Sequence, residues 1–349
     1  MWTRARTRSK RELAVDRDGE LRREQKTPVW RPLAGDRDTA SQCILTPPRL
    51  CWPHGERQLS ATRRALVLGG GGFVASAWEV GLISGVAATG ADLRDHDMFL
   101  GTSSGARVAL HLASGSGLDE LFHQQLGPVP SPPASTSTVD WQKVRAEWAR
   151  AKEIGGGSAA ILRRVGALAL GIAGSGGGDR RKAVAAQLPA QTWPEKALVI
   201  VAVNAETGER RAFDRNTGVE LVDAVMATTA FWGWPPAFFE GYHYIDGGFY
   251  SSDNADVASG FDQVLILALR PPVPSLCLAS LDEAVESLRA GGAQVEVVHP
   301  DEDCLEAFAS VGGPMSPAVR APAAKAGRAQ GQRLGEGGLL SKQRERMTP

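Results

Sequence analysis

The sequence has few of the features that mark secreted, zinc-binding or membrane-spanning proteins. Its 349 residues contain four cysteines, none in a C-x-x-C pair or at zinc-site spacing from a histidine, so neither a disulfide scaffold nor a metal site is expected. No run of about 18 apolar residues occurs, so no transmembrane helix is predicted. No apolar segment follows the basic start, so no signal peptide is predicted. These absences favour a cytoplasmic protein and leave peripheral membrane contact open.

A net charge is also lacking, because 39 Lys and Arg residues balance 39 Asp and Glu residues. A protein dedicated to nucleic acid usually has a strong basic excess, so no nucleic-acid partner is expected. The balance conceals a split. Residues 1–64 hold 15 basic and 8 acidic side chains, an excess of +7, and the remainder of the chain carries −7. A basic segment therefore precedes an acidic body.

Composition along the chain predicts three segments. Residues 1–61 combine many charged side chains with scattered prolines and show no sustained apolar period, which is typical of a disordered extension. Residues 62–330 are expected to form the folded domain. Residues 331–349 are expected to be a disordered tail.

Within the predicted domain, short apolar runs bounded by glycine alternate with helical patterns. The predicted strands include residues 65–68, 97–100, 198–203, 242–245, 263–268 and 294–298, and the predicted helices include residues 75–88, 106–114, 219–228 and 281–290. Short apolar runs that alternate with helices are typical of buried parallel strands. The pattern predicts an α/β fold, a three-layer α/β/α sandwich with a central, mainly parallel sheet.

A G-x-S-x-G motif lies between a predicted strand and a predicted helix. Residues 101–105 read Gly-Thr-Ser-Ser-Gly, and Gly101 and Gly105 allow the sharp turn that exposes a nucleophilic serine at the end of a strand. Ser103 is therefore the candidate nucleophile. The alternative role for Ser103 is an ordinary helix N-cap.

Four consecutive glycines, Gly69, Gly70, Gly71 and Gly72, follow the first predicted strand. Their backbone N–H groups are unobstructed and suit an anion. A dinucleotide site would need a glycine where Val74 stands, and no P-loop lysine follows, so a nucleotide is disfavoured. The oxyanion of an acyl-transfer reaction is the favoured anion.

Asp246, Gly247 and Gly248 follow the predicted strand at residues 242–245. A carboxylate at the end of a strand, with two small residues after it, is able to approach a partner hydroxyl closely. The same sequence is also common in hairpin turns.

Taken together, the glycine loop, the G-T-S-S-G motif and the Asp-Gly-Gly motif resemble the patatin-like phospholipase family. The resemblance covers about residues 64–330 and implies a Ser–Asp dyad without histidine. Ser103 would be the nucleophile, Asp246 the general base, and the amides of Gly70, Gly71 and Gly72 the oxyanion hole. The implied activity is hydrolysis of a lipid or other acyl ester, of the phospholipase A or lysophospholipase type, with no cofactor and no metal.

Two alternatives remain open at this stage. Ser103, Asp246 and His299 occur in the chain order of a Ser-Asp-His esterase of the α/β-hydrolase kind. The chain is alternatively a catalytically inactive member of the fold that binds a lipid or a partner. Head group, acyl length and oligomeric state are not indicated by the sequence.

Two further segments bear on lipid binding. The apolar stretch at residues 159–173 contains Arg163 and Arg164, which would suit anionic head groups on a membrane surface. The aromatic residues at 231–235 are candidates for lining an acyl pocket, although packing in the core explains them equally well.

Overall fold

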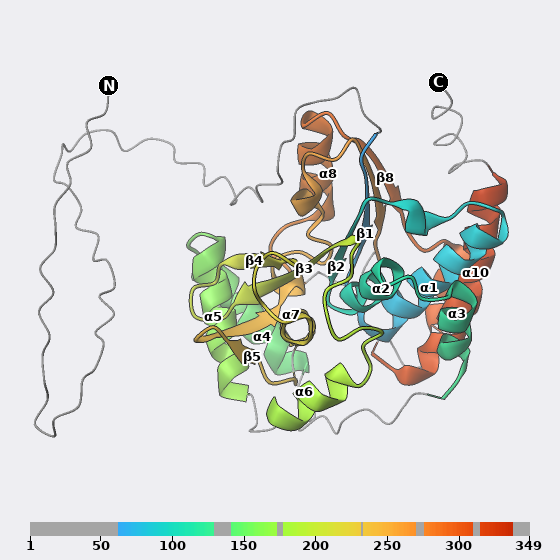
Figure 1. The fold of residues 1–349 in the computed structure, drawn as a ribbon. Helices are drawn as coiled ribbons and strands as arrows, with labels where there is room; N and C mark the ends of the chain where they lie inside the picture. Colours follow the sequence, from blue (N-terminus) through green and yellow to red (C-terminus); the bar gives the residue numbers. More distant parts are fainter. Residues whose placement is uncertain are drawn as a thin grey trace, which may run out of the picture. The chain divides into compact units, whose positions relative to one another are not determined.

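A mixed β-sheet forms the centre of the protein in the computed structural model (Figure 1). The structure describes residues 62–128, 141–172, 177–231, 233–269, 276–309 and 315–337, all of which belong to one unit, Leu59–Pro349. The predicted disordered extension, residues 1–61, lies outside the described residues. In the described part of the chain, no helix has the length and apolarity needed to span a membrane.

Eight described strands pair in one sheet in the order β5-β6-β3-β2-β1-β7-β8, and β4 pairs with β3. The five strands from β3 to β8 in this order are parallel to one another, whereas β4, β5 and β6 run antiparallel to their neighbours. The strands are β1 (Arg64–Leu68), β2 (Met98–Thr102), β3 (Ala197–Asn204), β4 (Arg210–Phe213), β5 (Ala237–Phe239), β6 (Tyr242–Asp246), β7 (Gln263–Leu267) and β8 (Gln294–Val298). The prediction of a mainly parallel sheet is confirmed.

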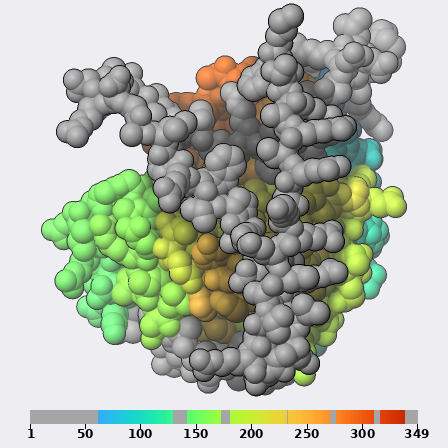
Figure 2. Space-filling model, turned by 60° about the vertical axis from the view of Figure 1, so that its left-hand side comes forward, coloured from blue at the N-terminus to red at the C-terminus, as the bar shows by residue number. Residues whose placement is uncertain are grey.

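Helices cover both faces of the sheet, which gives the predicted three layers (Figure 1). The larger core cluster joins one sheet face to α1 (Gly72–Ala88), α2 (Ser104–Ala113), α3 (Leu118–Leu126), α6 (Gly177–Ala185), α7 (Leu221–Thr228), α9 (Glu302–Ala309) and α10 (Arg320–Glu336). A second cluster joins β3 and β6 to α4 (Trp141–Glu153) and α5 (Ser158–Ile172), whose side chains gather in green on one side of Figure 2. Beyond them, α8 (Leu281–Ala290) packs against β8 and the short helix η3 (Ala255–Ala258).

Most of the predicted strands and helices lie close to their predicted positions, and several short elements were not predicted. The bounds of α8 and β8 match the prediction, whereas α3, α6, α9 and β5 were not predicted. The three residues of β5 and the nine-residue helices give too few apolar repeats for a clear period. Helix α10 continues to Glu336, beyond residue 330, where the sequence suggested that the domain ends. The rest of the predicted tail, residues 338–349, lies outside the described residues.

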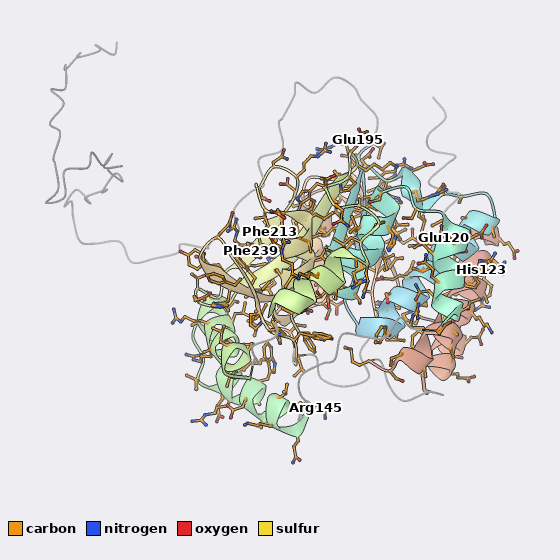
Figure 3. The ribbon with its side chains drawn as sticks, turned by 60° about the horizontal axis from the view of Figure 1, so that its bottom comes forward. Glu120, His123, Arg145, Glu195, Phe213 and Phe239 are labelled. Atoms are coloured by element: carbon orange, nitrogen blue, oxygen red, sulfur yellow. The ribbon has the colours of Figure 1, made fainter. Side chains whose placement is uncertain are left out.

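An aromatic cluster packs where the antiparallel strands meet. Phe213 of β4 and Phe239 of β5 approach in a T-shaped contact with ring centroids 5.6 Å apart, and Figure 3 shows the two side by side. Tyr244 of β6 stacks on Phe239 at 4.3 Å. Such pairs add to the free energy of burial, so this cluster secures the strand that carries Asp246.

Helices α1 and α10 touch through glycine. A Cβ added at Gly81 of α1 would lie 2.1 Å from the Ala324 carbonyl oxygen of α10, and one at Gly331 would lie 2.1 Å from the Leu82 carbonyl oxygen. The backbones approach too closely for any larger side chain. Helix α1 begins at the glycine loop, so this contact holds the loop's helix in place.

We expect Gly81→Ala to lower the free energy of unfolding by about 1–3 kcal/mol, because overpacking against backbone outweighs the gain in helix propensity. The matched control is Gly171→Ala in α5, where an added Cβ meets no atom within 4 Å. Urea denaturation of the two variants checks this, and equal midpoints would contradict the close approach.

Candidate active site

The backbone at Ser103 adopts the sharp turn that the sequence predicts. Ser103 joins β2 to α2 with φ 54° and ψ −123°, a conformation that is rare for a residue other than glycine. A Cβ at Gly101 would lie 2.3 Å from the Ala106 Cα, and one at Gly105 would lie 2.3 Å from the Leu68 carbonyl oxygen. Both glycines are therefore required by close packing of α2 on the strands.

The Ser103 hydroxyl donates a hydrogen bond to Asp246 Oδ2 over 2.6 Å. It does not cap α2. Strand register brings the two side chains together. Val201 of β3 pairs with Thr102 of β2, and the next residue, Ala202, pairs with Asp246 of β6 on the other side of β3. The structure thus brings together two residues that lie 143 positions apart.

Asp246 is fully buried at the end of β6. Its side chain is 0% exposed, and its Oδ1 accepts the backbone N–H of Gly248 over 2.8 Å. A Cβ at Gly247 would lie 2.4 Å from the Val201 carbonyl oxygen, so that glycine lets β6 end against β3. Burial raises the pKa of Asp246 to about 7, although the hydrogen bonds from Ser103 and Gly248 and the positive charge of Arg180 oppose the rise.

The end of α7 contacts both members of this pair. The backbone N–H of Ser103 donates to Thr228 Oγ1 over 2.8 Å, and the backbone N–H of Asp246 donates to the Ala230 carbonyl over 3.1 Å. The sequence analysis did not identify either residue. No local pattern marks them, because their role depends only on where the tertiary structure places the turn after α7.

Asn254 links the end of β2 to the residues that follow β6. This buried residue has a left-handed backbone with φ 50°. Its Nδ2 group donates to Thr102 Oγ1 over 3.0 Å and to the carbonyls of Gly247 and Ser251. Asn254 therefore fixes the residue before Ser103 relative to the residue after Asp246.

The glycine loop lies against the serine. A Cβ at Gly70 would lie 3.1 Å from the Ser103 Cβ. The amides of Gly69 and Gly70 donate to the carbonyls of Leu267 and Ser252, so neither is free to bind an oxyanion. Of the three amides predicted to form an oxyanion hole, that of Gly70 is thus already bonded, whereas those of Gly71 and Gly72, at the N-terminus of α1, have no backbone acceptor among the described residues. The oxyanion hole itself stays a prediction.

The model of the patatin-like phospholipase family matches residues 66–259, which include the glycine loop, Ser103 and Asp246. The chain belongs to the patatin-like phospholipase family. The resemblance noted from the motifs is thereby confirmed, and the general class of the protein is that of a lipid acyl hydrolase.

Two solved structures extend the comparison with the patatin-like domain. VipD from Legionella pneumophila is 12% identical with a TM-score of 0.41, and the match covers 80% of this chain and 67% of VipD. Full-length ExoU with SpcU, from the type III secretion system of Pseudomonas aeruginosa, is 17% identical with a TM-score of 0.36; the match covers 80% of this chain and 52% of that one. The chain spans about two thirds of VipD and about half of ExoU. A search of curated protein sequences found no match.

The histidine of the alternative triad, His299, has hydrogen-bond partners other than Asp246. His299 Nδ1 is 2.7 Å from the Ala268 carbonyl oxygen, and the His299 carbonyl accepts from Gln330 Nε2. The hydrogen-bond partners of the Asp246 carboxylate are Ser103 and Gly248. The structure therefore does not bring His299 to the predicted pair.

The side chains considered for lipid binding fall into two groups. Arg164 donates to the carbonyls of Ala151 and Gly155, where it closes the end of α4, and so is not free for a head group. Phe231 stacks on Phe249 with ring centroids 5.0 Å apart, in the core cluster that contains Ile245. Trp232 lies outside the described residues.

Among the residues that the structure describes, no group of three potential metal ligands occurs.

Two further acidic residues lie buried under the glycine loop. A Cβ added at Gly69 would lie 2.3 Å from Asp253 Oδ1. Asp253 Oδ1 and Glu79 Oε2 are buried with no hydrogen-bond partner among the described residues. Burial raises the pKa of Asp253 to about 7; burial and the neighbouring Asp253 raise that of Glu79 well above its usual value.

These buried acids predict a specific pH dependence of stability. Between pH 3.8 and about 7, folded Asp253 retains a proton that the unfolded chain releases, so the free energy of unfolding falls as the pH rises through this window. In Asp253→Asn this fall is shallower, which urea denaturation at several pH values measures. Asp282→Asn on the exposed start of α8 is the control. An unchanged slope in Asp253→Asn would show that Asp253 ionises as readily when folded as when unfolded.

Proposed function

We propose that this protein hydrolyses acyl esters of phospholipids or lysophospholipids through a Ser103–Asp246 dyad that works without histidine. The observation that carries the proposal is the 2.6 Å hydrogen bond from the Ser103 hydroxyl to the fully buried Asp246 carboxylate. A serine hydroxyl is a weak nucleophile unless a positioned base accepts its proton. A carboxylate with a pKa of about 7 is a far better base than one in water.

The first half-reaction forms an acyl-enzyme. Asp246 accepts the Ser103 proton as the oxygen attacks the ester carbonyl carbon, and the carbonyl oxygen becomes an oxyanion. In this proposal the amides of Gly71 and Gly72, at the positive end of α1, donate hydrogen bonds to it. Asp246 then gives its proton to the departing alkoxide as the carbon–oxygen bond breaks.

The second half-reaction releases the acid. Asp246 accepts a proton from a water molecule that attacks the acyl carbon. Asp246 then gives this proton to Ser103 Oγ as the bond between Oγ and the acyl carbon breaks. Phe231, Phe249 and Trp148 pack in the core cluster that contains Ile245, the residue before Asp246. The preference for a lipid ester in this proposal rests on the family and not on this buried cluster.

We expect a fluorophosphonate probe to label the wild-type protein and not Ser103→Ala. Labelling persists in Ser104→Ala, the matched control, because the buried Ser104 hydroxyl has no hydrogen-bond partner among the described residues. Asp246→Asn labels about 10²–10⁴-fold more slowly, because the general base is lost.

The same probe separates the alternatives. His299→Ala is expected to label at the wild-type rate; a folded His299→Ala that takes up no probe would contradict the dyad and favour the Ser-Asp-His esterase. A folded wild-type protein that takes up no probe would favour a catalytically inactive lipid-binding protein. A panel of phospholipids and lysophospholipids, tested with the full chain, then identifies the substrate.

The pH dependence of kcat/KM provides an independent check. Asp246 accepts a proton only when it is ionised, so activity rises with pH through an apparent pKa of about 7. A rate that is constant from pH 5 to 8 would contradict Asp246 as the base.

A further inference from the structure

A buried arginine bonds to the segment that contacts both Ser103 and Asp246. Arg180 of α6 is 5% exposed, although the sequence places it in an Arg-Arg-Lys run that is typical of a solvated surface. Its Nη2 group donates to the Met226 carbonyl over 3.1 Å and to Thr229 Oγ1 over 2.9 Å. Its Nη1 group donates to the Pro235 carbonyl over 3.1 Å. A guanidinium makes such a set of bonds in fixed geometry, which a lysine ammonium does not reproduce.

Arg180 donates hydrogen bonds to residues that lie next to those in contact with the Ser103–Asp246 pair. Thr228 accepts the Ser103 amide and Ala230 accepts the Asp246 amide. Met226 and Thr229, which bond to Arg180, alternate along the chain with these two residues at the end of α7. Arg180 thus fixes the short segment 226–230, and this segment sets the backbone position of both reacting side chains.

Arg180 also acts on Asp246 through its charge. Its positive charge opposes the rise in the pKa of Asp246 that burial causes. Burial lowers the pKa of Arg180 to about 10, so the guanidinium stays charged near neutral pH. Arg107 of α2 faces Arg180 and bonds to Gln187. Among the described residues, no other charged side chain contributes clearly to the pKa of Asp246.

We infer that Arg180 is a positioning residue for the Ser103–Asp246 pair, which it serves through the hydrogen bonds that fix segment 226–230 and through its buried positive charge. The inference rests on the proposed function for its catalytic meaning. The two effects are separable, because a substitution is able to retain the charge while it removes the hydrogen bonds.

The test compares Arg180→Met with Arg180→Lys in the full chain. The substrate is 4-nitrophenyl butyrate, which carries no titrating group near neutral pH. In Arg180→Met we expect the acid limb of kcat/KM to move up by about one pH unit, because the carboxylate loses its positive neighbour. In Arg180→Lys the limb stays at its wild-type position, while kcat falls about 10-fold or more because the segment is less well fixed.

The neighbouring Arg181 provides the matched control. It lies on the same helix and pairs with Glu220 and Asp223 at the surface, without a contact to segment 226–230. Arg181→Met therefore leaves both the acid limb and kcat at wild-type values. A wild-type limb and rate in both Arg180 variants would overturn the inference, as would an equal shift of the limb in Arg181→Met.

A second measurement does not require activity. Carbon-13 NMR of the Asp246 carboxyl, assigned with Asp246→Asn, follows its titration directly, and Arg180→Met should raise the apparent pKa. An unchanged titration would refute the electrostatic role. Wild-type protein without Ser103-dependent hydrolysis would refute the proposed function, while the titration still decides this inference. Thermal melting verifies folding, and Arg180→Gln replaces the Met variant if that variant is unfolded.

Discussion

The site depends on one hydrogen bond, which the Ser103 hydroxyl donates to the fully buried Asp246 carboxylate. In water a carboxylate is too weak a base to activate a serine, and a third group such as histidine normally takes that role. Burial changes the balance because it disfavours the charged form and so makes the carboxylate more basic. The hydrogen bonds from the Ser103 amide to Thr228, from the Gly248 amide to Asp246 and from Asn254 to Thr102 hold the pair in position.

Glycine makes the short distances possible. Gly101 and Gly105 let α2 approach β2 and β1, Gly247 lets β6 end against β3, and Gly70 brings the loop to the serine. At each of these places a Cβ would meet a neighbour at 3.1 Å or less. The unusual turn at Ser103 is tolerated because packing and hydrogen bonds fix the residues on both sides.

The sheet and its long helices follow from local patterns, and so does the identity of the motifs. Apolar runs bounded by glycine predicted β1, β7 and β8, and helical periodicity predicted α1 and α8. Local patterns failed for α6, because its charged sequence gives no apolar stripe, yet Arg180 on it is buried. They also failed for Thr228 and Ala230, whose contacts with the site come from residues more than a hundred and about sixteen positions away respectively.

The sequence by itself determined the α/β class, the three motifs and the resemblance to a family, because strand and turn formation depend on residues close together in the chain. Only the tertiary structure decided which amides of the glycine loop remain free and that His299 lies with Ala268 and Gln330. It also decided that Arg180 lies behind Asp246. These outcomes depend on strand order and burial, and a carboxylate's basicity is set by surroundings that no local pattern contains.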